Sequence, residues 1–495
     1  MKNKKYSEIH PREIANKSNK QNLLDAIQMS LAVESEAVHR NTKVFNTNRY
    51  SATAKLFDYE ELKSKARSIK EKAIDDLPNL INQLKNVIEQ RSGKFFVAKT
   101  PKEATDYIKN ICIEKKAKLV VKAKSITSEE IGLNHVLEEA GVQVAETDLA
   151  EFILQISKEQ PSHNVAPAIH QSRERISKLF KDNFNTDLPL ETGEELTKFA
   201  RDILREKFLS ADIGISGANC ISADTGSILL VESEGNIRLT THLPATHIAI
   251  AGIEKIIHNY KDLAVFIELL AASGTGQSLT SYTNIITPPL QLPLLNLNGR
   301  EDTHREFHLV LIDNGRMTMR ADPVFHEALY CIRCSACMNV CANFQIVGGH
   351  AFGGECYTGG IGGAWTAGTT GDVKNARFAD LCTGCSRCIP NCPVQINIPG
   401  LNTEIKSRII KEEGGANFQK QFFGNFSKMA KLASTLPGLA NKASEFSLSR
   451  KMMEKIIGFD SNRSVPKFSE KTLEKAYKEY RNNNAANSNS EIKAI

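Results

Sequence analysis

Nine of the eleven cysteines in this 495-residue chain lie between Cys331 and Cys392. Eight of them form two matched runs with the spacing C-x2-C-x2-C-x3-C, and Pro393 follows the second run. Bacterial ferredoxins with two [4Fe–4S] clusters have this spacing, and the fourth cysteine of each run binds the other cluster. The spacing therefore predicts one cluster on Cys331, Cys334, Cys337 and Cys392, and a second cluster on Cys341, Cys382, Cys385 and Cys388.

Zinc is the alternative metal, because two C-x2-C pairs can bind it tetrahedrally. It does not account for eight cysteines in two runs of four, so the spacing favours electron-carrying clusters. The ninth cysteine, Cys356, lies in the gap 342–381 between the runs. We interpret it as an unliganded residue in a glycine-rich cover over a cluster, with a spare ligand or a reactive thiol as alternatives. The long gap, with helical sequence after it, favours an α-helical ferredoxin module.

Upstream of the cysteines, short apolar runs alternate with helical periods. This order implies an α/β domain with a parallel sheet and helices on both faces. Residues 60–91 repeat apolar positions at helical spacing, with an interruption expected at Pro78. Strands are predicted at 94–98, 118–121, 142–145, 246–252 and 307–312, paired strands within 221–232, and helices at 101–116, 125–140 and 262–272.

Charge and composition indicate the class of protein and its segments. The net charge is +6, from 63 basic and 57 acidic residues, which is too mild to predict a nucleic-acid-binding face. The N-terminus has charge but no apolar core, and no stretch approaches the roughly 20 apolar residues of a membrane helix. We expect a cytoplasmic protein, either free or peripheral to a membrane. The expected segments are 1–58 (polar, helical), 59–316 (α/β), 325–400 (two-cluster module), 401–480 (helical) and 481–495 (disordered).

The sequence lacks the usual motifs of a complete oxidoreductase. No G-x-G-x-x-G follows a predicted strand, so a Rossmann site for flavin or NAD is not supported. His304 and His308 are four residues apart but run into a strand, where they are too far apart to chelate easily. The chain therefore has electron carriers but no visible hydride acceptor, which favours a subunit or relay that works with a partner.

Several segments resemble the lactate utilisation protein B family, the iron–sulfur subunits of a three-part system for L-lactate. The match covers roughly 60–400. Two positions depart from the family pattern, because Ala342 follows Cys341 where proline is usual, and Ser335 stands where glycine is usual. The matching segments are 122–130 (KAKSITSEE), 146–148, 223–227 (ADTGS), 234–240 (EGNIRLT), 274–277 (GTGQ), 308–316 (HLVLIDNGR) and 331–337.

The resemblance implies a lactate-utilisation (LUD) domain with an α/β fold like sugar-phosphate isomerases and CoA transferases. It also implies a non-catalytic subunit that passes electrons from L-lactate, or another 2-hydroxy acid, toward the respiratory chain. The implied partners are a cysteine-rich subunit, a stand-alone LUD protein and an acceptor such as a quinone or a membrane-associated carrier. Two alternatives remain: a LUD-domain enzyme with structural clusters, and a redox or iron sensor.

Some polar residues of the LUD segments are candidates for a ligand site, although an ordinary structural role is the favoured interpretation of each. Lys122, Lys124, Ser125 and Thr127 follow a strand and could hold an anion. The other candidates are Thr225–Gly226, Thr275–Gly276 and the group Glu234, Asn236 and Arg238, whereas His242 and His247 show no ligand spacing.

Overall fold

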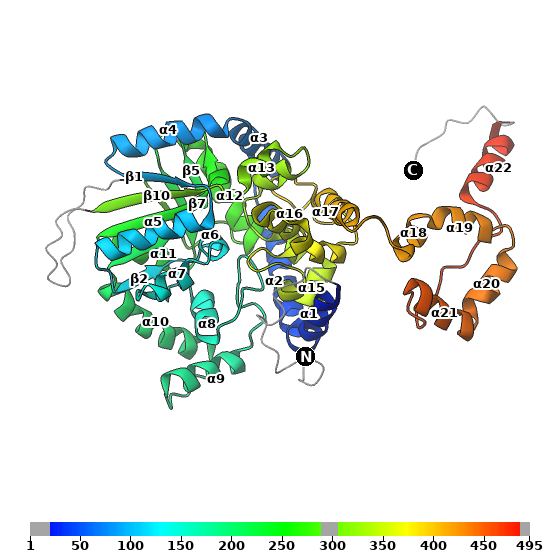
Figure 1. The fold of residues 1–495 in the computed structure, drawn as a ribbon, viewed down its shortest axis with the longest axis horizontal. Coiled ribbons are helices and arrows are strands. Elements are labelled where there is room, and N and C mark those ends of the chain that lie inside the picture. The colour runs from blue at the N-terminus through cyan, green and yellow to red at the C-terminus, as the bar shows by residue number, and fades with distance from the viewer. Residues whose placement is uncertain (1–19, 289–304, 486–495) are drawn as a thin grey trace. The chain divides into compact units, whose positions relative to one another are not determined.

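The structure is a computed structural model that describes residues 20–288 and 305–485. The chain divides into two compact units, 1–408 and 409–495. The first unit contains both the sheet and all the cysteines (Figure 1). His304 and 486–495 lie outside the described residues.

Six strands form a parallel sheet in the order β1-β10-β7-β4-β2-β3. Every strand predicted for this sheet is present within one residue of its expected ends. The parallel α/β prediction is therefore confirmed, and the sheet gains β4, which no pattern predicted. The strands are β1 (Lys94–Ala98), β2 (Leu119–Lys122), β3 (Gln143–Glu146), β4 (Ile213–Ser216), β7 (Thr246–Gly252) and β10 (Glu306–Ile312).

Successive side chains of each strand point to opposite faces of the sheet, so each face has its own hydrophobic core. Val120 of β2 packs into one core with α5 and α7. Its neighbours Leu119 and Val121 pack into the opposite core with α8, α9 and α10. Both cores are almost fully buried, and each buried aliphatic side chain contributes about 1.5–3 kcal/mol. The helices are α5 (Pro101–Glu114), α7 (Leu133–Glu139), α8 (Leu149–Ser157), α9 (Arg173–Phe184) and α10 (Gly193–Ser210).

The helix predicted over 125–140 is divided in two. It comprises α6 (Ile126–Glu130) and α7, because Gly132 between them adopts φ +63°, which ends one helix before the next begins. The two short helices leave the Ser125–Thr127 turn directly beyond the carboxyl end of β2. This turn becomes part of a cavity described below.

A second, small sheet has the order β8-β5-β6-β9. The pair expected within 221–232 is confirmed as antiparallel β5 (Cys220–Ser222) and β6 (Ile228–Glu232). β8 (Ile256–Ile257) and β9 (Tyr282–Ile286) flank it. The buried helix predicted at 262–272 is α12 (Leu263–Gly274), which packs on this sheet.

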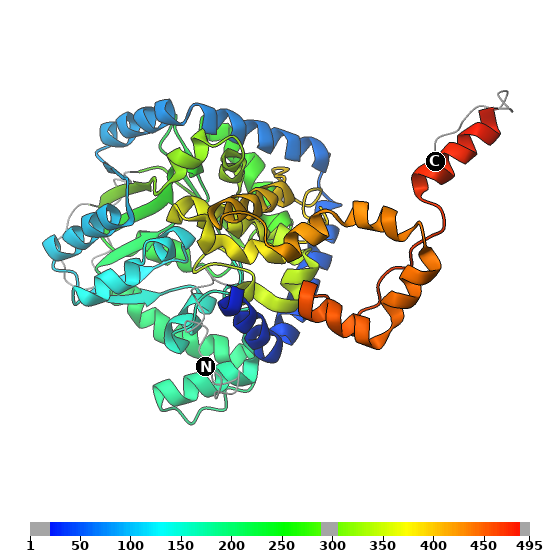
Figure 2. The same cartoon turned by 45° about the vertical axis from the view of Figure 1, so that its right-hand side comes forward.

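From residue 20 onward, four helices precede the first strand: α1 (Lys20–Val33), α2 (Ser35–Thr53), α3 (Tyr59–Asp75) and α4 (Leu77–Gln90). The predicted interruption is confirmed, with Pro78 in the first turn of α4. The blue helices α1 and α2 pack against α15 of the cysteine region, as Figure 2 shows. In addition, Lys63 of α3 donates to the carbonyl of Pro390 at 3.0 Å, and Arg67 donates to that of Gln395 at 2.8 Å. These N-terminal helices therefore join the sheet domain to the cysteine region.

The cysteine region is helical and contains no strand among its described residues, which confirms the expected α-helical module. Phe344 and Trp365 are fully buried in it. Its elements are η5 (Phe325–Tyr330), α14 (Ala336–Asn339), α15 (Ala342–Ala351), α16 (Gly359–Thr370), η6 (Val373–Leu381) and α17 (Ile398–Glu412).

The described part of the second unit is helical. It continues from α17 with α18 (Phe418–Gly424), α19 (Phe426–Ala433), α20 (Pro437–Glu445), α21 (Ser447–Ile457) and α22 (Leu473–Ala485). The prediction of disorder from 481 was wrong for 481–485, which belong to α22. No helix within 20–288 or 305–485 is both long enough and apolar enough to span a bilayer.

Candidate metal centre and adjoining cavity

The two cysteine runs fold alike. Cys331 follows η5 and Cys382 follows η6, and each opens a tight loop to the next cysteine. In each loop the residues on both sides of the second cysteine have a left-handed backbone: Arg333 (φ +64°) and Ser335 (φ +65°), then Gly384 (φ +70°) and Ser386 (φ +61°). The first loop directs the Arg333 N–H toward Cys331 Sγ at 3.4 Å. Such loops present backbone donors to sulfur.

The folded runs line two adjoining cavities, and Cys337 lines both. Each cavity contains the fourth cysteine of the other run, namely Cys392 in the first and Cys341 in the second. The first cavity is lined by Cys331, Cys334, Cys337 and Cys392, and the second by Cys341, Cys382, Cys385 and Cys388 together with Cys337.

The donor set of each cavity fits sulfur-ligated iron. No carboxylate or imidazole appears among the described residues that line either cavity. Four thiolates without oxygen or nitrogen ligands suit Fe–S clusters or zinc. Burial raises the pKa of Cys388 to about 12 and that of Cys392 to about 11, so neither thiol ionises at neutral pH without a cation. A bound metal deprotonates such thiols outright.

The two cavities differ in their access to solvent. Cys334 and Cys392 of the first are 8% and 7% exposed. In the second, Cys385 is exposed, as are its neighbours Gly384, Ser386 and Arg387. The first cavity is therefore the more enclosed of the two, although Cys331 and Cys337 are only partly buried, and the second lies at the surface.

A buried charge network adjoins the first cavity. Arg316, the first residue of α13 (Arg316–Ala321) after β10, donates to Glu130 at 2.7 and 2.9 Å and to Glu254 at 2.6 Å. Arg333, between Cys331 and Cys334, donates to the other oxygen of Glu254 at 2.9 Å, and its guanidinium lies 4.1 Å from the ring centre of Trp365. Burial alone would raise the pKa of Glu254, but Arg316 and Arg333 hold it well below its usual value.

A larger cavity of about 340 Å³ opens beyond the carboxyl ends of β2, β3 and β4 and reaches Arg333 and Cys334. Such crevices are the usual ligand sites of parallel α/β sheets. Candidate residues from three sequence segments meet here: Lys124, Ser125 and Thr127; Glu234 and Asn236; and Thr275.

Other sequence candidates have structural roles. Lys122 is fully buried and pairs with Glu146 at 2.8 Å and Glu129 at 2.9 Å. Arg238 lies over the ring of Tyr282, with 4.0 Å to its centre. The remaining structural positions are Thr225–Gly226, which forms the β5–β6 turn; His242, which bonds to the Arg238 carbonyl; His247, which bonds to Ser216; and His308, which bonds to Tyr107 and Glu306.

Glu234 and Lys255 are among the cavity residues with shifted pKa values. Burial, with the neighbouring charge of Asp148, raises the pKa of Glu234 to about 7. Burial, with the nearby charge of Arg333, lowers the pKa of Lys255 to about 8. Lys255 follows β7 in the short η3 (Ile253–Lys255), and no sequence pattern identified it. Shifted pKa values in a cleft are typical of functional sites.

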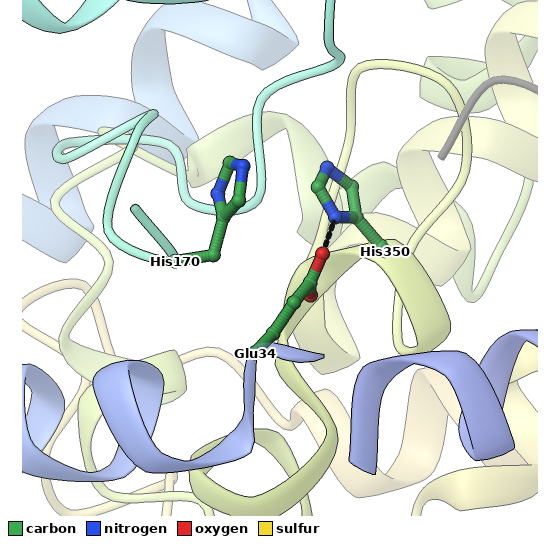
Figure 3. A group of neighbouring side chains, drawn as sticks. All are labelled: Glu34, His170 and His350. Carbon is green, nitrogen blue, oxygen red and sulfur yellow. Dashed lines mark hydrogen bonds and ion pairs between the residues drawn. The ribbon is translucent and has the colours of Figure 1, made fainter. Parts of the chain in front are cut away.

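A buried cluster of Glu34, His170 and His350 joins the N-terminal helices to α15 (Figure 3). His350 bonds to Glu34 through Nδ1 and donates from Nε2 to the Gln160 carbonyl at 2.7 Å. Both ring nitrogens of His350 thus lie against oxygen acceptors. A protonated His350 ring, paired with the Glu34 carboxylate, has an N–H to donate to each of them. The three residues are far apart in sequence, so no motif could reveal the cluster.

Cys356 lines neither cysteine cavity. Burial and the charge of Glu130 raise the pKa of its thiol well above the usual value, which disfavours the reactive thiolate form. Cys112 and Cys220 are buried in the sheet domain.

Ser335→Gly is expected to raise the free energy of unfolding by about 1 kcal/mol, because a left-handed backbone costs a residue with a Cβ roughly 1–2 kcal/mol. Denaturant unfolding under anaerobic conditions measures this change. Ser335→Ala is the matched control, since it removes the buried hydroxyl but keeps the Cβ. An equal gain from Ser335→Ala would contradict the backbone explanation.

Stability should fall with acid because buried histidines are held neutral. His163 Nδ1 accepts from the N–H groups of Val165 and Ala166 at 3.2 and 3.0 Å, so Nε2 carries the proton that it donates to Asn339. Burial lowers the pKa of His163 to about 3, and likewise that of His247. Below the unfolded value of about 6.5, only the unfolded state gains these protons, so stability declines from there until about pH 3.

Between pH 7.5 and 5.5, the two histidines should together reduce the free energy of unfolding by about 3 kcal/mol. His163→Gln keeps a donor and an acceptor, and should remove about half of this loss. Urea unfolding at the two pH values tests the prediction, with His135→Gln on an exposed face of α7 as the control. An unchanged pH dependence in His163→Gln would refute it.

Comparison with known proteins agrees with this architecture. The family model described as LUD domain matches residues 81–312, and the one described as 4Fe-4S dicluster domain matches 327–396. "Lactate utilization protein B" of Bacillus velezensis is 39% identical over 81% of this chain and 82% of its own length. The Bacillus subtilis protein of the same name is 41% identical over 75% of this chain and 76% of its own.

A third relative is the "Uncharacterized electron transport protein YkgF" of Escherichia coli K12, which is 39% identical over 82% of both chains. These relatives span the sheet domain and the cysteine region together, in the same order. The resemblance found in the sequence is thereby confirmed, and the chain belongs to the lactate utilization protein B family.

Proposed function

We propose that the chain is an electron-transfer subunit of a system that oxidises L-lactate or a similar 2-hydroxy acid. In this proposal Cys331, Cys334, Cys337 and Cys392 hold one [4Fe–4S] cluster, and Cys341, Cys382, Cys385 and Cys388 hold another. Each cluster, when bound, supplies reversible one-electron transfer. The observation that carries the proposal is the exchange of fourth cysteines between the two cavities, the arrangement used by two-cluster ferredoxins.

The difference in burial supports a direction for the relay. The more enclosed first cavity adjoins the large cavity of the sheet domain through Cys334. The second cavity opens at the surface around Cys385, where a partner can approach. We place the exchange with a redox partner at this surface, and the internal end of the relay at Cys334.

The partners follow from the family. The proposed ones are a cysteine-rich subunit, a stand-alone LUD protein and an acceptor such as a quinone. Residues 409–495 contain 15 basic and 9 acidic residues, so they carry the whole excess charge of the chain. Their helices also expose apolar side chains such as Leu432 and Leu448. Basic, amphipathic helices favour anionic lipid surfaces, which supports a peripheral contact with the membrane that holds the acceptor.

The test is lactate oxidation by the reconstituted partners with a quinone analogue. The wild-type chain should support turnover, and a chain lacking both Cys334 and Cys385 should not. Full-rate lactate oxidation with the chain that lacks Cys334 and Cys385 would contradict the relay role. Co-sedimentation of the full chain with anionic and neutral vesicles tests the membrane contact separately, and equal binding to both would count against it.

A further inference from the structure

The large cavity has an unpaired cation in its wall. Lys255 is 7% exposed, and no hydrogen bond or ion pair joins its Nζ to any residue that the structure describes. Its Nζ is not among the fully buried polar atoms that lack a partner, but most of the side chain is withdrawn from water, where a charge without pairing or hydrogen bonding is costly. Its position on the cavity lining means that a ligand can reach it.

The neighbouring acid is already engaged. Glu254 shares its two carboxylate oxygens between Arg316 and Arg333, and its backbone carbonyl accepts from Lys70. Glu254 therefore offers Lys255 no ion pair. Lys70 does not line the cavity, and Arg333, which does, is paired with Glu254. Among the residues that line the cavity end near Cys334, Lys255 is thus the cation without a carboxylate partner.

The opposite end of the cavity is acidic and rich in hydrogen-bonding groups. Asp148 and Glu234 line it, and Lys124 beside them donates to the Val165 carbonyl at 2.6 Å. Glu232, which also lines the cavity, is paired with Arg238 outside it. This end would repel a second negative charge on a ligand, whereas its carboxylates accept hydrogen bonds from a hydroxyl group.

We propose that this cavity binds a small hydroxylated monocarboxylate, with the carboxylate against Lys255 and a hydroxyl at Glu234 and Asp148. One free cation matches one negative charge, and the acidic end disfavours a phosphate dianion. A volume of about 340 Å³ is at the small end of ligand sites, which suits a small metabolite. The inference stands on the cavity; only the choice of L-lactate as first probe rests on the proposed function.

The site would give the chain a role beyond relaying electrons. A ligand held between Lys255 and Glu234 lies in the same cavity as Cys334, the buried thiol proposed to hold the first cluster. The fold thus places a small-molecule site of the sheet domain next to the internal end of the relay. Lys255, Glu234 and Asp148 are the specificity residues of that site.

Isothermal titration of the anaerobic, iron-loaded full chain tests the proposal. L-lactate, D-lactate, propionate and inorganic phosphate are the probes. A hydroxylated monocarboxylate should bind, propionate more weakly because it lacks the hydroxyl, and phosphate least. Lys255→Met should weaken binding at least tenfold, since a charged hydrogen bond is lost, and Lys255→Arg should restore part of it. Lys102→Met, on the exposed face of α5, is the matched control.

Iron content and the EPR spectrum of each variant show whether the protein remains folded and loaded. Binding by Lys255→Met equal to wild type, or phosphate binding in preference to every monocarboxylate, would overturn the proposal. So would a Lys255→Met variant that changes only the EPR spectrum, because Lys255 would then serve the cluster. If the wild-type chain binds the ligand but fails in the quinone assay, the relay role alone is rejected. If it works in the quinone assay but binds none of the probes, the ligand site alone is rejected.

Discussion

Cys334→Ser is expected to lower the iron content from about eight to about four per chain and to abolish electron transfer through the protein. Serine is a poor substitute for a buried thiolate, and the other three cysteines of the first cavity cannot complete a four-ligand set. Loss of a group outside the ligand shell commonly costs 10–100-fold in metal affinity or activity, so loss of a ligand should cost more than about 100-fold. Iron and sulfide analysis with EPR after dithionite reduction measures the first effect, and acceptor reduction the second.

Cys385→Ser and Cys356→Ser separate the causes. Cys385→Ser should also remove about four irons and stop the relay, but with a smaller loss of stability, because Cys385 lies at the surface. Cys334 is enclosed beside Arg49 of α2, so an empty first cavity should loosen the contact between the N-terminal helices and the cysteine region. Cys356→Ser should keep about eight irons. Eight irons in Cys334→Ser, or four in Cys356→Ser, would contradict the ligand assignment.

The cysteine cavities could be predicted because short spacings in the sequence identify the cysteines that line them. Six of the eight thiols are fixed by three-residue steps within a run, and the crossing of Cys341 and Cys392 is a known property of such pairs. The parallel sheet was equally accessible, since β-branched runs such as 119–122 and 246–252 can be buried only within a sheet covered on both faces. Both predictions depend on patterns within about ten residues.

The large cavity was only partly visible in the sequence. Lys124 and Glu234 were candidates, but Lys255 was not, because nothing in the run Ile253–Lys255 distinguishes a cavity lysine from a surface one. Its burial arises when β7 directs it between the small sheet and the cysteine loop. Lys122 is the opposite case: it was a candidate, but Glu129 of α6 and Glu146 of β3 pair with it in the fold. Such pairings depend on tertiary contacts, and charge alone does not reveal them.

The ion pairs of Arg316 also depend on tertiary contacts, and removing them should have a large effect on stability. Arg316→Met is expected to lower the free energy of unfolding by about 3–5 kcal/mol, because it leaves buried carboxylates without their cation. Arg316 is fully buried and binds both oxygens of Glu130, whereas Glu254 keeps Arg333 as a second partner. Glu130 should therefore account for most of the loss. Chemical unfolding of the loaded protein at pH 7.5 measures it.

The pH dependence identifies the cause. In the wild-type protein, Arg316 helps to hold the pKa of Glu130 below its usual value; without it, burial should raise that pKa. The variant can then relieve the buried charge by taking up a proton, so its deficit should shrink as pH falls from 8 toward 5.5. Glu130→Gln added to Arg316→Met should recover part of the stability at pH 8.

Arg408→Met, which removes a partly exposed pair with Asp322, is the matched control and should cost at most about 1 kcal/mol. A deficit in Arg316→Met that is independent of pH and of Glu130 would mean that lost packing against Trp365, and not the uncompensated carboxylate, causes the instability.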